Sequence, residues 1–176
     1  MGSGYITQRK IEKEDYSPFK GIVDDSIIEV TADMLSGITS ISSYAFYQCA
    51  NLISVDIPSG VTSIGNSAFS YCRAVTSITI PNGVTSIGSS AFFECRLVSS
   101  LTIPSSVTSI GSSAFAYMPI LTSVTVESTT PPTIGTDIFS IFAGSTLVIY
   151  VPAESVEEYK AANNWSRYAS RIQAIP

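Results

Sequence analysis

Apolar and polar residues along the centre of the chain follow a pattern that returns every 23 residues. The complete units begin at Ile38, Val61, Val84 and Val107, and the second and third units agree at 15 of 23 positions. A shorter, related unit precedes them at IIEVTADMLSG, and another follows at TIGTDIFSIFAGSTLVIYVP. A fixed period of this length indicates equivalent coils that bury their apolar side chains against one another. We therefore expect a repeat solenoid whose terminal units are degenerate.

Each unit contains two stretches that are predicted to be extended. Residues 76–80 alternate between polar and apolar side chains, which predicts a short strand, and Pro81 ends it. Residues 85–87 form a second extended stretch. Gly88 follows it, and we expect there either a positive φ or a backbone approach too close for a side chain.

The segment SSAFFEC after this glycine is too short for an average helix and predicts a helical turn. Such a turn would direct Ala91, Phe92 and Cys95 into the interior. Stacked coils would then place one phenylalanine above the next. The expected column consists of Phe46, Phe69, Phe92, Phe115 and Phe139.

These motifs carry a family resemblance. The succession L/V-x-S-V/I/L-x-I-P, V-T-S-I-G and A-F-x-x-C resembles the bacterial BspA-like leucine-rich repeat over residues 29–152. The resemblance implies a leucine-rich repeat solenoid with short parallel strands on a concave face, and with helical turns and short strands elsewhere. It also implies a secreted or surface protein that mediates adhesion, although similar arrays occur in phage structural proteins. The family supplies no catalytic motif that could be transferred to this chain.

Three segments are expected. Residues 1–28 combine an apparent expression scar with a charged amino-terminal segment, and they lack the pattern of a signal peptide. Residues 29–152 form the solenoid, with full repeats at 38–129. Residues 153–176 resemble the cap that closes such arrays. Val156, Tyr159 and Ala162 share one face of a predicted capping helix, and three later apolar residues are expected to continue the cover. These later residues are Trp165, Tyr168 and Ile172.

The charge distribution narrows the function. Of 23 charged residues only six lie between residues 34 and 153, so serine, threonine and backbone groups must hydrate the central coils. A net charge of -5 disfavours nucleic-acid partners, and no apolar run is long enough to span a membrane. The chain has no histidine, which excludes the commonest general base and imidazole metal ligands. We expect no enzyme, no cofactor and no metal.

Three cysteines recur at the repeat period, namely Cys49, Cys72 and Cys95. Metal binding is one hypothesis for such a column. Met118 occupies the equivalent position in the fourth unit, and methionine replaces cysteine better as an apolar filler than as a thiolate ligand. We therefore predict buried, free thiols.

Two charged pairs invite other hypotheses. Asp24 and Asp25 are adjacent but match no calcium loop, so a solvated cluster at the entry of the solenoid is favoured. Arg73 and Arg96 are one period apart and could form a small anion-binding pair, or could simply be solvated.

The candidate binding site is the outward side of the predicted concave strands, where solenoids gather equivalent side chains from successive coils. Its predicted residues are Ser54, Asp56, Ser77, Thr79, Ser100, Thr102, Ser123, Thr125 and Tyr150. This hydroxyl-rich face could bind a protein or a glycan, or it could be merely a hydrated sheet. A second, aromatic set surrounds the turns and is either exposed or packed as spacers. It consists of Tyr47, Tyr71, Phe93 and Tyr117.

The favoured function is a non-catalytic binding or adhesion module of a bacterial secreted or cell-surface protein. The chain is expected to be a monomer that contacts a protein or glycan partner and does not insert into membranes. The alternative is a structural spacer or a virion component of the phage-tail type.

Overall fold

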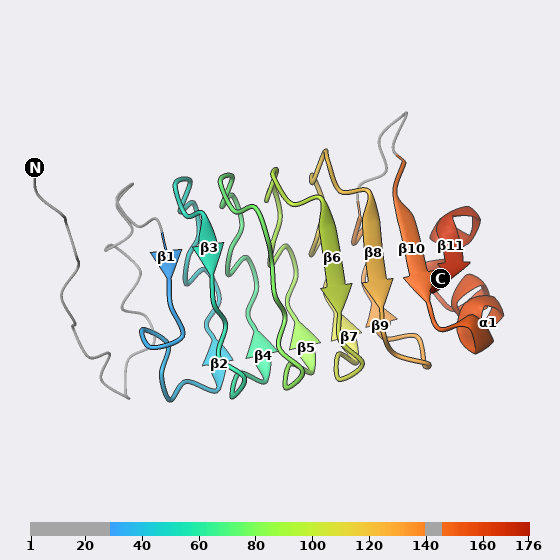
Figure 1. Cartoon of the computed structure of the whole chain (residues 1–176), viewed down its shortest axis with the longest axis horizontal. Helices are drawn as coiled ribbons and strands as arrows, with labels where there is room; N and C mark the ends of the chain where they lie inside the picture. Colours follow the sequence, from blue (N-terminus) through green and yellow to red (C-terminus); the bar gives the residue numbers. More distant parts are fainter. Residues whose placement is uncertain (1–28, 140–145) are drawn as a thin grey trace, which may run out of the picture.

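The computed structural model describes residues 29–139 and 146–176. It is a stack of coils along one long axis, with β1 near one end and α1 at the other (Figure 1). The charged segment before residue 29, including Asp24 and Asp25, lies outside the described residues.

The first side of each coil supplies the strands that the polar–apolar alternation predicts. One sheet has the order β11-β10-β8-β6, and β1 and β3 form a separate pair; all neighbours are parallel. The coil between them is joined to the larger sheet by a bridge from Thr79 to Thr102. The strands are β1 (Glu29–Val30), β3 (Ser54–Val55), β6 (Ser100–Ile103), β8 (Ser123–Val126), β10 (Val148–Val151) and β11 (Ile172–Ala174).

A second side of the coils forms a five-stranded parallel sheet in which the strands follow chain order. Its register pairs equivalent residues, so that Ile64 lies beside Ile41 and Ile87 beside Ile64, each buried. The strands are β2 (Ser40–Ile41), β4 (Ser63–Ile64), β5 (Ser86–Ile87), β7 (Ser109–Ile110) and β9 (Thr133–Ile134). The prediction of a second extended stretch is confirmed.

A glycine follows β4, β5, β7 and β9, and a close approach between coils explains it. Gly88 does not have a positive φ. A Cβ atom there would lie 2.6 Å from the backbone nitrogen of Asn66 and 2.6 Å from the carbonyl carbon of Gly65 in the preceding coil. A side chain at this position would therefore force the coils apart.

The predicted helical turn is wrong. Ser90 and Glu94 have positive φ angles of 55° and 62°, and the segment is a run of overlapping turns. The N–H groups of Ser90, Phe92 and Glu94 donate to carbonyl oxygens of the next coil at 2.8–3.0 Å, whereas a helix would direct them to its own carbonyls. This side of the stack is a third hydrogen-bonded seam.

The side chains of the turn nevertheless point where the sequence predicts. Ala91, Phe92 and Cys95 are buried. The five core phenylalanines stack with ring centroids 5.0–5.9 Å apart and interplanar angles of 4–20°, which confirms the predicted column. The column is the centre of the hydrophobic core.

The carboxyl-terminal segment combines helical turns with a strand. It contains the 3-10 helix η1 (Ala153–Ser155), α1 (Val156–Ala161) and the 3-10 helix η2 (Trp165–Arg171). Tyr159, Trp165 and Tyr168 are buried, and Val156 and Ala162 pack against the core. The prediction of a short helix is confirmed. The strand β11, which begins at the buried Ile172 and pairs with β10, was not predicted.

Candidate functional site

We use the name strand face for the outward side of β3, residues 76–80, β6, β8, β10 and β11. Strand register aligns its predicted residues in rows: Thr102 lies beside Thr125, and Thr125 beside Tyr150. Six of the predicted site residues are exposed, namely Ser54, Asp56, Ser77, Thr79, Ser100 and Thr102. The other three, Ser123, Thr125 and Tyr150, are half-buried. The face is therefore most open over its amino-terminal and central coils.

The strand face is not one continuous sheet. Asp56 donates its N–H to the carbonyl of Val30 in β1, so it is hydrogen-bonded with the β1–β3 pair. Ser100 and the later site residues belong to the larger sheet. Ser77 and Thr79 lie at the junction, where Thr76 N–H reaches the Ile53 carbonyl at 3.3 Å. The predicted site residues thus fall into two hydrogen-bonded groups joined by a loosely paired coil.

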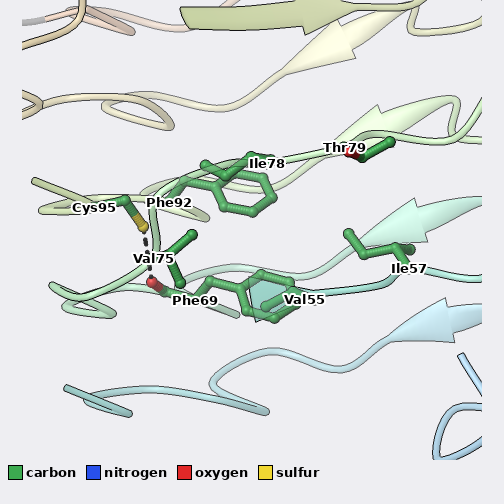
Figure 2. A pocket seen from close by; sticks show the side chains of 8 residues that line it. All are labelled: Val55, Ile57, Phe69, Val75, Ile78, Thr79, Phe92 and Cys95. Atoms are coloured by element: carbon green, nitrogen blue, oxygen red, sulfur yellow. Dashed lines mark hydrogen bonds between the residues drawn. The ribbon is translucent and has the colours of Figure 1, made fainter. Parts of the chain in front are cut away.

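A small cavity lies under this junction (Figure 2). Its volume of about 10 Å³ has room for about one water molecule. Thr79 is the one polar residue of its lining, and the rings of Phe69 and Phe92 bound it on the core side, as Figure 2 shows. The other lining residues are Val55, Ile57, Val75, Ile78 and Cys95. The cavity is a packing gap beside the irregular strand, and it is too small and apolar to hold a polar ligand.

The strand β11 adds residues that the sequence interpretation missed. Gln173 is exposed and lies in register beside Tyr150, so it extends the row of site residues by one strand. Arg171 donates from Nη1 to the carbonyl of Leu147 at 3.0 Å. The sequence signal for this strand is weak, because Ile-Gln-Ala-Ile has a single polar residue between apolar ones and is interpreted as part of the helical cap.

Several hydroxyl groups serve the fold and are not available to a ligand. Beside the second sheet, the Oγ1 atoms of Thr62, Thr85 and Thr108 each donate a hydrogen bond at 3.0–3.1 Å. The acceptor is in each case the backbone carbonyl of the equivalent threonine in the preceding coil. By contrast, within the described residues the structure shows no protein hydrogen bond for the hydroxyls of Thr79 and Thr102. The two threonines can therefore contact a partner without breaking an internal bond.

The cysteine column is structural. All three thiols are free and buried, as predicted. The Sγ atoms of Cys72 and Cys95 donate to the carbonyls of Phe46 and Phe69 at 3.1 and 3.4 Å; the Cys95 bond is drawn in Figure 2. Burial raises the pKa of Cys95 to about 12, and the hydrogen bond with Cys49, together with burial, raises the pKa of Cys72. These two thiols are therefore protonated at neutral pH and poor nucleophiles.

The arginine pair that the sequence offers as an anion site also holds a carboxylate of the chain itself. Arg73 Nε lies 3.2 Å from Glu94 Oε2, and Arg96 Nη2 lies 2.7 Å from the same oxygen. The Glu94 side chain is 13% exposed and each arginine side chain is 50% exposed. The Glu94 carboxylate thus neutralises one of the two positive charges. Glu94 lies in the same coil as Arg96, and the stacking of coils places it beside Arg73 of the preceding coil.

The aromatic residues of the turns form a continuous surface row. We use the name aromatic row for the contacting rings of Tyr44, Tyr47, Tyr71, Phe93 and Tyr117. Tyr44 and Tyr117 are 57% and 47% exposed, and the three rings between them are half-buried. Both alternatives from the sequence are realised, since the rings contact one another between coils and remain accessible.

The stack of coils with two parallel sheets and a turn seam defines a leucine-rich repeat solenoid. The chain belongs to the family described as BspA type Leucine rich repeat region, which matches residues 26–159 in six copies. Comparison with curated proteins gives no match.

Solved structures share the fold. A leucine-rich repeat protein of T. pallidum is 20% identical, with a TM-score of 0.53, 85% of this chain covered and 87% of that chain. The pneumococcal vaccine antigen PcpA is 20% identical, with a TM-score of 0.53 and coverage of 78% and 40%. A leucine-rich cell surface protein from Faecalibacterium prausnitzii A2-165 is 26% identical, with a TM-score of 0.44 and coverage of 70% and 40%. The chain thus spans about two fifths of the length of the last two proteins.

Within residues 29–139 and 146–176, no helix has the length and apolar composition that crossing a bilayer requires.

Proposed function

We propose that the protein is a non-catalytic binding module of a bacterial secreted or cell-surface protein, and that its strand face contacts a protein or a glycan. The observation that carries this proposal is the row of hydroxyls at Thr79, Thr102 and Thr125, which lie beside one another on parallel strands and continue to Tyr150. Asp56 lies on the neighbouring β1–β3 side of the same face. Such a row offers hydrogen-bond donors and acceptors on a rigid backbone. Few groups of the protein therefore lose conformational freedom when a partner binds.

The chemistry of the described residues favours binding over catalysis. The buried thiols of Cys72 and Cys95 are protonated at neutral pH, and Asp56 is the one carboxylate among the predicted site residues. A chain without histidine also lacks the commonest general base. The description of a pneumococcal relative as a vaccine antigen supports a surface location.

The strand face should bind weakly as a single copy. Tyr150 is the only aromatic side chain among the predicted site residues, and tryptophan, tyrosine and arginine anchors provide most of the affinity of known interfaces. Several copies on one cell or particle could raise the avidity by about 10² to 10⁴ without new contacts.

A second candidate is a structural spacer or virion component. Its support is the rigid stack, in which the five-stranded sheet and the turn seam connect successive coils by hydrogen bonds. A spacer needs no exposed binding residues. Loss of binding on substitution of strand-face residues would therefore favour the binding module over the spacer.

The test is a strand-face variant that carries D56K, T79R, T102R and Y150R, compared with the original chain on immobilised host matrix proteins and mucin glycans. Multivalent display should reveal binding that the monomer shows only weakly, and the variant should lose it. A control for added positive charge places two arginines on the second sheet at exposed positions, Ser40→Arg and Thr133→Arg. A folded strand-face variant that retains full binding would contradict the assignment of this face.

A further inference from the structure

The aromatic row crosses four coils on the turn side of the stack. The first coil contributes Tyr44 and Tyr47, and each later coil contributes one ring. Successive centroids from Tyr47 through Tyr71 and Phe93 to Tyr117 are 5.7, 5.5 and 4.9 Å apart. These residues are alternately the first and second residue after the core phenylalanine. The row therefore advances at the spacing of the coils.

Core packing does not account for this row. The phenylalanine column already fills the interior, with every ring nearly parallel to the next. The rings of the aromatic row meet instead at 84°, 62° and 51°, and its end members Tyr44 and Tyr117 are about half exposed. Edge-to-face contacts hold the rings in place, so a ligand would meet a preorganised surface.

Charged groups flank the middle of the row. The Arg73 guanidinium carbon lies 5.4 Å from the centroid of the Tyr71 ring, and Glu94 holds both Arg73 and Arg96. The cluster carries one net positive charge in a chain whose net charge is -5. Arg73 contacts Glu94 through Nε, so the outer edge of its guanidinium keeps donors that can bind a carboxylate in a bidentate manner.

A chain of sugars combines the features that this surface requires. A pyranose ring has an apolar C–H face that suits an aromatic ring and a polar rim that suits arginine and tyrosine hydroxyls. A repeating ligand suits a repeating row, and a carboxylate on the sugar matches the positive cluster. We propose that the aromatic row, with Arg73 and Arg96, is a second binding surface, and that it takes an extended acidic polysaccharide built from uronic-acid sugars.

The proposal is independent of the strand face, because the aromatic row lies on the turns of the coils and shares no residue with the strand-face site. The row is also open along its length. Its end rings Tyr44 and Tyr117 are both about half exposed, and rings accessible from one end to the other favour an extended chain over a compact ligand.

The experiment is affinity gel electrophoresis of the whole chain through gels that contain polygalacturonate. We expect the polymer to retard the original protein and its fully methyl-esterified, uncharged form to do so at least about tenfold less, since a charged hydrogen bond is lost. Tyr71→Ala should weaken the retardation by at least about tenfold, and so should R73Q combined with R96Q. Arg167→Gln removes a single arginine that is ion-paired with Asp137 outside the row and serves as a control for the loss of one positive charge.

The possible outcomes separate this surface from the strand face. Retardation that the strand-face variant retains and the row variants lose supports the proposal. No retardation, equal retardation by the uncharged polymer, or unchanged retardation of folded row variants overturns it. If the row variants instead lose binding to a host protein and the polymer has no effect, the row is a protein-binding surface and the polysaccharide assignment is wrong. Melting curves establish that each variant is folded.

Discussion

At the residue scale, one glycine in each unit determines how closely two coils can stack. A Cβ atom on Gly65, Gly88, Gly111 or Gly135 would lie 2.3–2.6 Å from a backbone atom of the preceding coil. Backbone atoms cannot rotate away as a flexible side chain can. Ser42 holds the equivalent position in the first complete unit, at the edge of the five-stranded sheet as far as the structure describes it.

This packing predicts opposite results for two glycines. Gly88→Ala should lower the free energy of unfolding by more than about 2 kcal/mol, because the added methyl group must displace the backbone of Gly65 and Asn66. Gly60→Ala is the matched control, since its Cβ would meet nothing closer than the Ile38 carbonyl at 3.9 Å. Urea denaturation of both variants measures the difference, and equal stabilities would contradict the close-approach explanation.

The buried thiols should be protected from reagents. In the native protein a thiol-reactive dye should modify Cys49, Cys72 and Cys95 slowly, because all three are at most 2% exposed. After denaturation it should modify all three. Rapid native labelling, or an intact mass two daltons below the reduced value, would show that the column is open or oxidised.

Cys95 also predicts a loss of stability in alkali. The pKa of Cys95 is about 12 in the folded chain against an ordinary value of 9.0, so unfolding favours the thiolate above pH 9. Its contribution is complete below pH 9 and decreases as the pH rises towards 12, with a slope of at most about 1.4 kcal/mol per pH unit. Cys95→Ala should reduce this slope in urea denaturation between pH 8 and 10.5. An unchanged slope would mean that other groups cause the alkaline loss.

At the element scale, the strands and the core follow from the sequence because they depend on which side chains are apolar. The alternation at residues 76–80 and the recurrence of Phe92 each report a local environment that repeats in every coil. The turn does not follow in this way. Serine and glutamate rarely adopt the left-handed region, and Ser90 and Glu94 do so because their N–H groups donate to the next coil. No local pattern contains that information.

In the candidate sites too, some features follow from the local sequence pattern and others depend on contacts between coils. The outward residues of the strand face follow from alternation, and their alignment in rows follows from the common period. The separation of Asp56 from the larger sheet and the shared partner of Arg73 and Arg96 depend on contacts between coils. Gln173 was missed because three residues pair as a strand only where β10 offers an open edge.

The cap closes the last coil with hydrogen bonds as well as apolar surface. Tyr159 OH donates to the Ser128 carbonyl at 2.8 Å, Trp165 Nε1 donates to the Pro132 carbonyl at 2.8 Å, and β11 covers the edge of β10. Deleting residues 153–176 would expose this edge and the buried core beside it, and both favour self-association. We expect light scattering to report aggregates or dimers, and a stable monomer after truncation would argue against the capping role.

At the scale of the whole molecule, each coil contacts mainly the coils before and after it. The register of both sheets repeats with the unit, as in the pairing of Ser63 with Ser86 and of Ser86 with Ser109. The stability of such a stack is approximately a sum over coils and their interfaces. The effect of a deletion on stability should therefore depend more on whether it keeps the repeat register than on how many residues it removes.

This property predicts the effect of removing one coil. Deleting residues 84–106 joins Gly83 to Val107, the equivalent of Val84, so every remaining coil keeps a neighbour in register and Phe69 can stack on Phe115. The protein should keep its strand signal in circular dichroism and unfold cooperatively, with a melting temperature only modestly lower, because one interface is lost. Deleting residues 84–94 is the control: it removes about half as much chain but shifts the register of all later coils, which should abolish cooperative unfolding. If both deletions unfold alike, the coils are not interchangeable units and long-range contacts stabilise the stack.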